Sequence, residues 1–440
     1  MYRYILASDI DSDAFIAALL RDDPRLAIIT RGASRIRVYI QSDAFRIRYL
    51  RSSDWMHDQK IVDALADEFP GATLTTPAAF GMWLLRKKFH VGDIFMRMDS
   101  RGDFRARFTR ASLYGGRCEV YQPGSHPGTW AYDINSSYSY AAYRLQFPHP
   151  NLTYKRQTRQ ADALRDILTL PGASQCVVSQ SGMRPYLPFR VRNYAGEIRT
   201  LYPELHLCRG IWTHNELRAA LERGVQIVCV EKSYLTHEVE NPFREFIEYC
   251  YGRRAEHKIW KLILNATWGR FAIVPSEDSG LGIWRPASAG DAEAWAELPA
   301  DKRHVACGIG WIGIIRRDIE AYPLWNAMIQ ADARQRLYDL AGRCDAIYVD
   351  TDCVFTRDCT VFDSQISSEL GGLKARYLRS FHARGAKLYI ADREAHAKGV
   401  SGATAADVLG APITHERDGG GGGLTWPHYR CGVDSEWPDL

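Results

Sequence analysis

The most informative part of the chain is the stretch Ala346-Ile347-Tyr348-Val349-Asp350-Thr351-Asp352-Cys353-Val354-Phe355. Two carboxylates stand here between two short apolar runs of strand-forming residues. The pattern predicts a β-hairpin with Asp350 and Asp352 at its tip. If the residues are extended, these two side chains share one face of the hairpin. The alternative is a solvated surface turn, because Asp is common in such turns.

A pair of close carboxylates calls for a cation. At about 4 Å the two charges repel by roughly 4 kcal/mol at an effective dielectric of about 20. A protein seldom keeps such a pair on a buried turn unless a cation neutralises it. Oxygen-only ligands suit Mg²⁺ or Mn²⁺, and these ions usually bring substrate phosphates with them.

A third acid, Asp133, follows the apolar stretch Trp130-Ala131-Tyr132. The residues after it, Ser139 to Leu145, can continue as a helix. An acid at the end of a strand lies where α/β folds place their ligands. We therefore expect Asp133 to belong to the same site as the hairpin acids.

A basic stripe is predicted on a helix that runs through Lys258–Arg270. Lys261, Asn265 and Gly269 are spaced by four and so line one helix face. Three more basic residues are expected one or two turns earlier on nearly the same face: Arg254, His257 and Lys258. A basic stripe with an apolar back is suited to holding a triphosphate.

The order of these motifs resembles that of family B DNA polymerases, and most closely that of their protein-primed phage branch. Tyr114-Gly115-Gly116, before the first acid, resembles the Tyr-Gly-Gly motif of that branch. Lys387-Leu388-Tyr389 resembles its Lys-x-Tyr motif, and Ala397-Lys398-Gly399-Val400 follows at the expected place. Each motif alone is weak, but five in register across about residues 111–400 are specific together.

The resemblance implies an α+β fold with a right-hand polymerase palm, an antiparallel sheet, helical fingers, a reduced thumb and a small α/β N-terminal domain. We expect the N-terminal domain at 1–105, the palm at 106–211 and 305–400, the fingers within 212–304, and a Gly-rich thumb remnant or tail at 401–440. Strands are predicted near 25–30 and 36–40, and helices at 59–69 and 80–89. Residues 273–304 are interpreted either as a strand-displacement insertion or as a plain surface loop.

The same resemblance implies nucleotidyl transfer to a 3′-hydroxyl with two Mg²⁺ or Mn²⁺ ions. Asp133 and Asp352 would bridge both ions, the backbone carbonyl of Ile134 would be a further ligand, and Asp350 would be a supporting carboxylate. The incoming dNTP would meet these residues: Ser136, Tyr138, Arg254, Lys258, Lys261 and Asn265. Tyr138 would pack under the deoxyribose and exclude a 2′-hydroxyl.

Template and primer DNA would meet a further set of residues: Tyr114, Gly115, Gly116, Trp268, Gly269, Thr351, Lys387 and Tyr389. Trp268 stands where the family usually has Tyr, and its ring is expected to stack on the templating pair. Lys387 and Tyr389, two apart on a strand, are expected to face the primer terminus. A terminal protein primer is a possible further partner.

Composition limits other interpretations. The 440 residues carry a net charge of only +4, so any DNA-binding surface must come from local placement of charge. The ten Cys show no Cys-x-x-Cys pair and are interpreted as reduced thiols. No apolar run reaches the roughly eighteen residues of a membrane helix, and the N-terminus lacks the shape of a signal peptide, so we expect a cytoplasmic protein without a membrane partner.

Several alternatives stay open. A primer-independent primase-polymerase of the same family would look much the same in sequence. An RNA-making or reverse-transcribing palm enzyme would share only the hairpin acids. A catalytically silent nucleic-acid-binding relative would be expected to lose acids that this chain keeps. Asp9, Asp11 and Asp13 lack the Glu of a proofreading exonuclease motif, so the first 105 residues are interpreted as a degenerate remnant of that domain.

Overall fold

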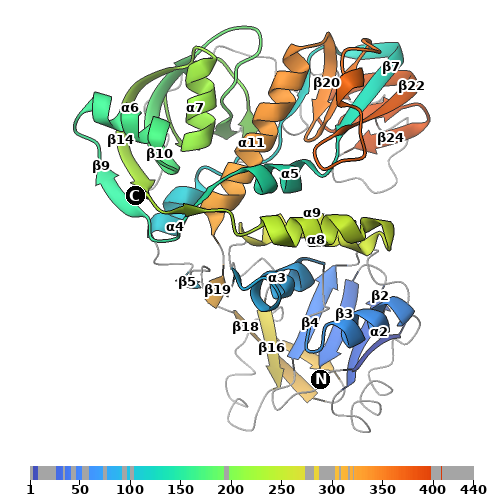
Figure 1. Ribbon diagram of the computed structural model, residues 1–440. Helices are drawn as coiled ribbons and strands as arrows, with labels where there is room; N and C mark the ends of the chain where they lie inside the picture. Colours follow the sequence, from blue (N-terminus) through green and yellow to red (C-terminus); the bar gives the residue numbers. More distant parts are fainter. Residues whose placement is uncertain are drawn as a thin grey trace. The chain divides into compact units, whose positions relative to one another are not determined.

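The computed structural model describes residues 104–192, 198–272 and 322–397, and the shorter stretches 3–7, 26–32, 35–40, 46–51, 59–72, 77–91, 97–99, 282–286, 303–306, 309–315, 318–320 and Val408. The chain divides into two compact units (Figure 1). The first unit combines residues 1–103 with 245–321, and the second combines 104–244 with 322–440.

The second unit is built on a curled antiparallel sheet of seven strands in the order β24-β23-β22-β7-β21-β20-β6 (Figure 1). The strands are β6 (Cys118–Val120), β7 (Gly124–Ile134), β20 (Ala346–Asp350), β21 (Cys353–Thr356), β22 (Leu373–Gly385), β23 (Leu388–Ala391) and β24 (Glu394–Ala397). Ala131 and Phe355 belong to an apolar cluster on one face, whereas Tyr132 and Ile134 belong to a cluster on the other. Because side chains alternate along a strand, Asp133 shares the face of Ala131.

A twenty-residue helix, α11 (Pro323–Gly342), covers the second of these faces. Its first residue is proline, which suits the first turn of a helix because no backbone donor is needed there. Leu337 and Leu340 of this helix pack in the cluster of Tyr132. The helix α5 (Ser137–Arg144), which follows β7, is tied to α11 by a 2.8 Å ion pair between Arg144 and Asp332.

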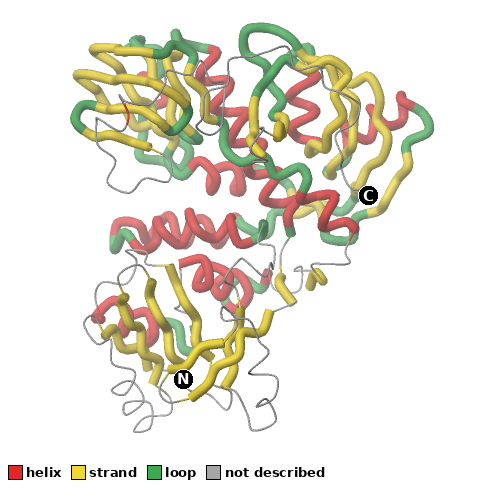
Figure 2. Tube along the Cα trace, turned by 180° about the vertical axis from the view of Figure 1, so that it is seen from behind, coloured by secondary structure: helices red, strands yellow, loops and turns green. Residues whose placement is uncertain are grey.

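A four-stranded antiparallel sheet in the order β13-β10-β14-β9 forms the rest of the second unit's core (Figure 2). Its strands are β9 (Thr153–Arg156), β10 (Gly172–Gln180), β13 (Leu205–Thr213) and β14 (Gln226–Leu235), and its helices are α6 (Gln160–Thr169) and α7 (His214–Glu222). Trp212 is fully buried in this core, and its indole donates to the Pro188 carbonyl at 2.9 Å. The shorter elements are α4 (Phe104–Arg110), β8 (Phe147–Pro148), β11 (Phe189–Arg192), β12 (Ile198–Leu201), β15 (Val239–Glu240) and η5 (Asp363–Gln365).

The first unit has its own seven-stranded sheet, in which β1 and β2 are parallel and the other pairs are antiparallel. Its strands are β1 (Arg3–Ala7), β2 (Leu26–Gly32), β3 (Arg35–Ile40), β4 (Arg46–Arg51), β16 (Gly282–Pro286), β17 (Arg303–Ala306) and β18 (Ile309–Ile315), with β5 (Arg97–Asp99) and β19 (Asp318–Glu320) as a separate pair. Its helical elements are α2 (Gln59–Glu68), α3 (Pro77–Lys87), α8 (Arg244–Gly252), η2 (Arg253–Ala255) and α9 (Ile259–Arg270). Gly81 lets α3 approach α9, because a Cβ there would lie 2.0 Å from Thr267 Oγ1.

The predicted mixture of helices and antiparallel sheet is confirmed, as are the two helices and two strands predicted before residue 90. Of the two interpretations of residues 273–304, a plain surface loop does not hold for two stretches, because β16 and β17 join the sheet of the first unit. The predicted boundary at 211 does not separate the units, since residues 212–244 belong with the four-stranded sheet. Residues 305–321, predicted to be palm, fall in the first unit.

Some predictions fall outside the described residues. These are Asp9, Asp11 and Asp13, Lys398 to Val400, and the Gly-rich tail apart from Val408. No helix within the described ranges is both long and apolar enough to cross a lipid bilayer.

A buried ion pair joins α7 to α11 and generates a stability prediction. Glu216 and Arg334 lie 2.7 Å apart, with side-chain exposures of 1% and 2%. Arginine cannot shed its proton in a protein, so Glu216→Ala strands a buried charge and is expected to lower the free energy of unfolding by about 3–5 kcal/mol. Urea unfolding followed by circular dichroism measures this change.

The matched control is Glu222→Ala on the same helix, whose side chain is 73% exposed. An exposed ion pair contributes little, so this variant should lose less than about 1 kcal/mol. Equal losses for the two variants would contradict the assigned role of the buried pair.

Candidate active site

The predicted hairpin is confirmed: Asp350 ends β20, Cys353 begins β21, and the two residues are register partners. Thr351 between them has a φ of 60°, and the Asp352 N–H donates to the Asp350 carbonyl at 2.6 Å, as in a γ-turn. A β-branched residue rarely adopts this conformation, and such strain is often found at functional sites. The condition under which strand alternation would put Asp350 and Asp352 on one face is therefore not met, because the residue between them is not extended.

The third acid lies beside the hairpin, as expected. Asp133 lies on the neighbouring strand β7, where it is the register partner of Cys353 on β21. The Ile134 N–H donates to the Asp352 carbonyl at 2.8 Å, so the backbone itself joins the two motifs. Three carboxylates from segments more than two hundred positions apart in the sequence thus lie where the neighbouring strands β7, β21 and β20 begin or end.

The charges of these carboxylates act on one another. Burial, together with the carboxylates of Asp133 and Asp350, raises the pKa of Asp352 to about 7. A carboxyl group with a pKa near neutrality lacks enough positive charge nearby to stabilise its ionised form. A divalent cation bound beside Asp352 would supply that charge and favour its ionised form.

Lys387 supplies the nearest positive charge to Asp350. Its ammonium forms an ion pair with Asp350 and donates to Thr351 Oγ1 at 3.1 Å. Burial lowers the pKa of Lys387, but the Asp350 carboxylate raises it by more, so it lies above its ordinary value. The prediction that Lys387 lies two along a strand from Tyr389 is wrong, because Lys387 lies in the turn between β22 and β23 with a φ of 60°.

Tyr389 lies on β23 with its ring 5.2 Å from that of Tyr348 and 4.5 Å from that of His396. It is half-buried, so a contact with DNA stays a prediction. The hydroxyl of Tyr348 in turn accepts from the Lys387 N–H at 2.8 Å. An aromatic cluster therefore supports the turn that carries the lysine.

The donor set fits the implied metal ions in its chemistry. Among the described residues, no three His, Cys, Asp or Glu side chains are already arranged to hold an ion. Asp133 and Asp352 offer hard oxygen ligands, while Asp350 is occupied by Lys387. The residues that would hold Mg²⁺ or Mn²⁺ are thus Asp133, Asp352 and the Ile134 carbonyl, with Asp350 in a supporting position.

The Tyr-Gly-Gly motif is anchored rather than exposed. Tyr114 is 7% exposed, its ring stacks on Trp212, and its hydroxyl donates to the Ile211 carbonyl at 3.0 Å. The Tyr114 ring therefore belongs to the protein core. The expectation that the backbone of this turn approaches the template strand stays a prediction. Gly115 has a φ of 83°, which favours glycine.

Two residues of α11, which the sequence analysis missed, hold this motif. The Gly115 N–H donates to Gln330 Oε1 at 2.9 Å, and Arg334 donates to the Gly115 carbonyl. Gln330 and Arg334 are four apart on one helix face, but nothing in the sequence says which loop that face meets. Lys374, the register partner of Asp133 on β22, was missed for the same reason.

The residues after Asp133 begin α5. Ser136 adopts a left-handed conformation with a φ of 52° immediately before the helix, and Tyr138 lies in its first turn. Burial raises the pKa of Tyr138, so its hydroxyl stays protonated at neutral pH. A nucleotide contact for Ser136 stays a prediction.

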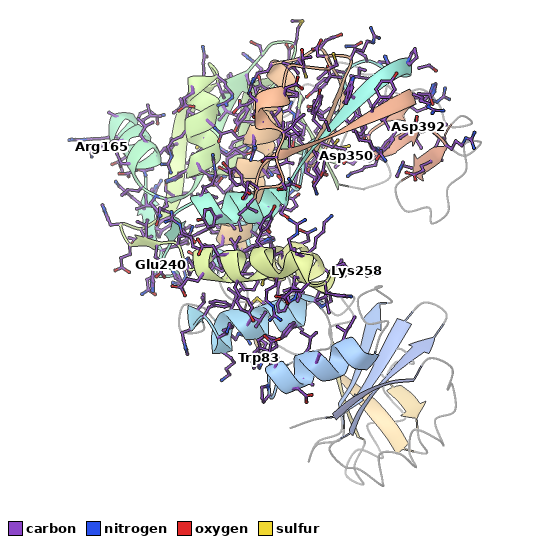
Figure 3. The ribbon with its side chains drawn as sticks, turned by 45° about the vertical axis from the view of Figure 1, so that its right-hand side comes forward. Trp83, Arg165, Glu240, Lys258, Asp350 and Asp392 are labelled. Atoms are coloured by element: carbon purple, nitrogen blue, oxygen red, sulfur yellow. The ribbon has the colours of Figure 1, made fainter. Side chains whose placement is uncertain are left out.

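The basic stripe of the first unit is confirmed in part. Lys258, Lys261, Asn265 and Gly269 are exposed, whereas the opposite face of α9 is buried. Arg254 does not share this face, because α9 begins at Ile259; it precedes the helix in η2 with its guanidinium 4.6 Å from the Tyr251 ring. Figure 3 labels Lys258 on the first unit and Asp350 on the second.

Trp268 corrects another prediction. Its side chain is 2% exposed, and its ring lies 6.1 Å from that of Phe246 in an edge-on contact. A ring packed in this way cannot stack on a base pair without rearranging the core. The apolar back of α9, not its basic face, explains why a tryptophan stands here.

Comparisons with known proteins bear on the family and the fold of the chain. A family model described as DNA polymerase type B, organellar and viral, matches residues 84–280. Phi29 DNA polymerase complexed with primer-template DNA has the same fold, with a TM-score of 0.59 and 12% identity over 91% of this chain and 84% of that chain. Its ternary complex with incoming nucleotides gives a TM-score of 0.59 at 13% identity, covering 90% of this chain and 84% of that chain.

The complex of phi29 DNA polymerase with single-stranded DNA gives a TM-score of 0.55 at 14% identity, covering 88% of this chain and 82% of that chain. No curated protein matches the chain significantly. The likeness to phi29 polymerase at these identities is one of fold. Together with the family match, it confirms the resemblance that the motifs predicted.

The raised pKa of Asp352 generates a prediction about stability and pH. A free Asp titrates near 3.9, so between about pH 4 and 7 the folded protein binds the proton more tightly than the unfolded chain. With divalent ions removed by chelation, wild type should lose on the order of 2 kcal/mol relative to Asp352→Asn as pH rises from about 5 to 8. Chemical unfolding across this pH range measures the difference.

The exposed Asp363 provides the control, since Asp363→Asn removes a charge far less buried. Its stability should follow that of wild type at every pH. If the free energies of unfolding of wild type and Asp352→Asn change with pH in parallel, burial and repulsion between the carboxylates do not destabilise ionised Asp352.

Proposed function

We propose that this chain, a type B DNA-directed DNA polymerase by its family match and its fold, joins deoxynucleotides to a 3′-hydroxyl by two-metal nucleotidyl transfer. The observation that carries the proposal is the meeting of Asp133 with the Asp350–Asp352 hairpin through the hydrogen bond from Ile134 to Asp352. The substrates are template and primer DNA and dNTPs. Two Mg²⁺ or Mn²⁺ ions, when bound, would stabilise the attacking and leaving oxygens of the reaction.

The chain's own residues have distinct tasks in this reaction. Asp133, Asp352 and the Ile134 carbonyl would hold the ions. Asp350 is oriented by its ion pair with Lys387, so it supports the site without itself being a ligand of the ions. Because Lys387 also reaches Thr351, it fixes the tip of the hairpin against which the primer terminus is proposed to lie.

The nucleotide is proposed to meet two surfaces. Lys261 on the exposed face of α9 and Lys258 at its N-cap offer point charges to the triphosphate, and Arg254 offers a guanidinium from η2. Asn265 and Gly269 of the same face approach the nascent base pair. Tyr138 lies under the deoxyribose and excludes a 2′-hydroxyl, with Ser136 beside it.

The domains follow from this assignment. The seven-stranded sheet of the second unit is the palm, α8 and α9 form the fingers, and the first unit's sheet is a shrunken exonuclease-like remnant. Gly115, Gly116, Thr351 and Tyr389 contribute to DNA contacts from the palm. Residues 401–440 are proposed as a reduced thumb or tail, and the reaction as cytoplasmic.

Priming separates the two candidate modes of action. A terminal protein as primer is the first, because the motifs resemble the protein-primed phage branch and phi29 polymerase shares the fold. Primer-independent synthesis is the second. Supplying template, labelled dNTPs and Mg²⁺ with and without a DNA primer distinguishes them. A silent nucleic-acid-binding relative is disfavoured because all three acids are present and brought together.

The central prediction concerns the two acids that hold the ions. Asp133→Asn and Asp352→Asn are each expected to lower nucleotide incorporation by at least about a thousandfold, because several kcal/mol of transition-state stabilisation come from the ions. DNA binding, measured by fluorescence anisotropy, should persist. Primer extension with Mg²⁺ and with Mn²⁺ measures incorporation.

Asp363→Asn again serves as the control and should extend primers as wild type does. Substantial extension by either acid variant would remove the basis of the assignment. Loss of DNA binding in parallel with activity would indicate unfolding, which the thermal transition of each variant detects.

A further inference from the structure

Gly116 lies in contact with the proposed sugar-selecting residue. A Cβ added at Gly116 would lie 3.0 Å from the Tyr138 hydroxyl and 2.8 Å from Thr351 Cγ2. Its backbone φ is not positive, in contrast to the 83° of Gly115. The absence of a side chain at Gly116 is therefore explained by its neighbours rather than by its backbone conformation.

The neighbours on one side of this contact cannot easily yield. Thr351 is held in its left-handed turn by a 2.7 Å hydrogen bond from its N–H to the Arg117 carbonyl, and its hydroxyl accepts from Lys387 at 3.1 Å. The guanidinium of Arg117 is itself buried in an ion pair with Glu119. The hairpin tip is thus anchored both through its backbone and through its side chain.

The Gly116 backbone is held as firmly. Both backbone polar groups of the preceding residue, Gly115, are hydrogen-bonded to α11: its N–H to Gln330 and its carbonyl to Arg334. Arg334 is in turn fixed by its buried pair with Glu216. Of the groups that meet at Gly116, the far end of the Tyr138 side chain is the one with freedom to move.

We propose that Gly116 is a positioning residue that determines specificity. Because Gly116 has no side chain, the Tyr138 hydroxyl can lie against its Cα. This contact sets how far the Tyr138 ring projects under the sugar of the incoming nucleotide. The inference rests on the proposed function of Tyr138. It adds that sugar selection depends on a clamp from α11, through Gln330 and Arg334, to the Tyr-Gly-Gly turn.

The test is a double-mutant cycle between Gly116→Ala and Tyr138→Phe. The added methyl pushes the Tyr138 ring away from the Cα of residue 116 and toward the nucleotide, so Gly116→Ala should raise the KM for dNTP about fivefold or more, with a smaller change in kcat. Tyr138→Phe removes the atom that the methyl meets. In the double variant the KM should return to within about twofold of that of Tyr138→Phe alone.

Gly342→Ala is the matched control, because a Cβ at this exposed position of α11 meets nothing within 4 Å. Its kinetic constants should equal those of wild type. Thermal unfolding shows whether Gly116→Ala folds. If it does not, the cycle is repeated in the Thr351→Ser background, which lacks the methyl 2.8 Å from the added Cβ while keeping the hydroxyl.

Tyr138→Ala separates failure of this inference from failure of the proposed function. It should raise ribonucleotide incorporation relative to dNTP by at least about tenfold if Tyr138 selects the sugar. Suppose that Tyr138→Ala incorporates ribonucleotides more readily, but that the effects of Gly116→Ala and Tyr138→Phe on KM simply add. That result would overturn the role of Gly116 and leave the polymerase assignment intact. An unchanged Tyr138→Ala would overturn sugar selection by Tyr138, and with it this inference.

Discussion

A single backbone hydrogen bond, from the Ile134 N–H to the Asp352 carbonyl, is the constraint on which the proposed site depends. It extends the pairing of β7 with β21, whose register places Asp133 opposite Cys353. A slip of one residue would turn Asp133 to the face that α11 covers. The apolar clusters on the two faces of the sheet oppose such a slip, so the core specifies where the acids meet.

The site stores both charge repulsion and backbone strain. Asp352 is partly protonated near neutrality, and Thr351 holds a conformation that β-branched residues avoid. Buried ion pairs beneath the site, Arg117 with Glu119 and Arg334 with Glu216, keep the surrounding backbone in place. Because the surrounding backbone is held in this way, the hairpin can keep repelling carboxylates close together until a cation neutralises them. Destabilising groups at a functional site are commonly offset by stability elsewhere in a protein.

Local pattern predicted the hairpin, the strand before Asp133 and the exposed basic face of α9, because each depends on residues close in sequence. It failed where distant residues decide. Trp268 and Tyr114 are aromatic residues within motifs, and only the packing of Phe246 and Trp212 around them shows that they belong to the core. Lys387 was placed on a strand because the left-handed position of the turn is taken by the lysine itself, a residue type that does not mark such a conformation. The clamp by Gln330 and Arg334 depends on a loop some two hundred residues away.

The proposed chemistry requires Asp133 and Asp352 together to hold two divalent cations. Electron paramagnetic resonance can count the Mn²⁺ ions bound tightly per chain in the presence of primed template and a non-hydrolysable dNTP analogue. We expect wild type to bind two ions tightly. We expect the variant that carries both Asp133→Asn and Asp352→Asn to bind none tightly. The same number of ions bound with unchanged affinity by that double variant would contradict the proposed chemistry.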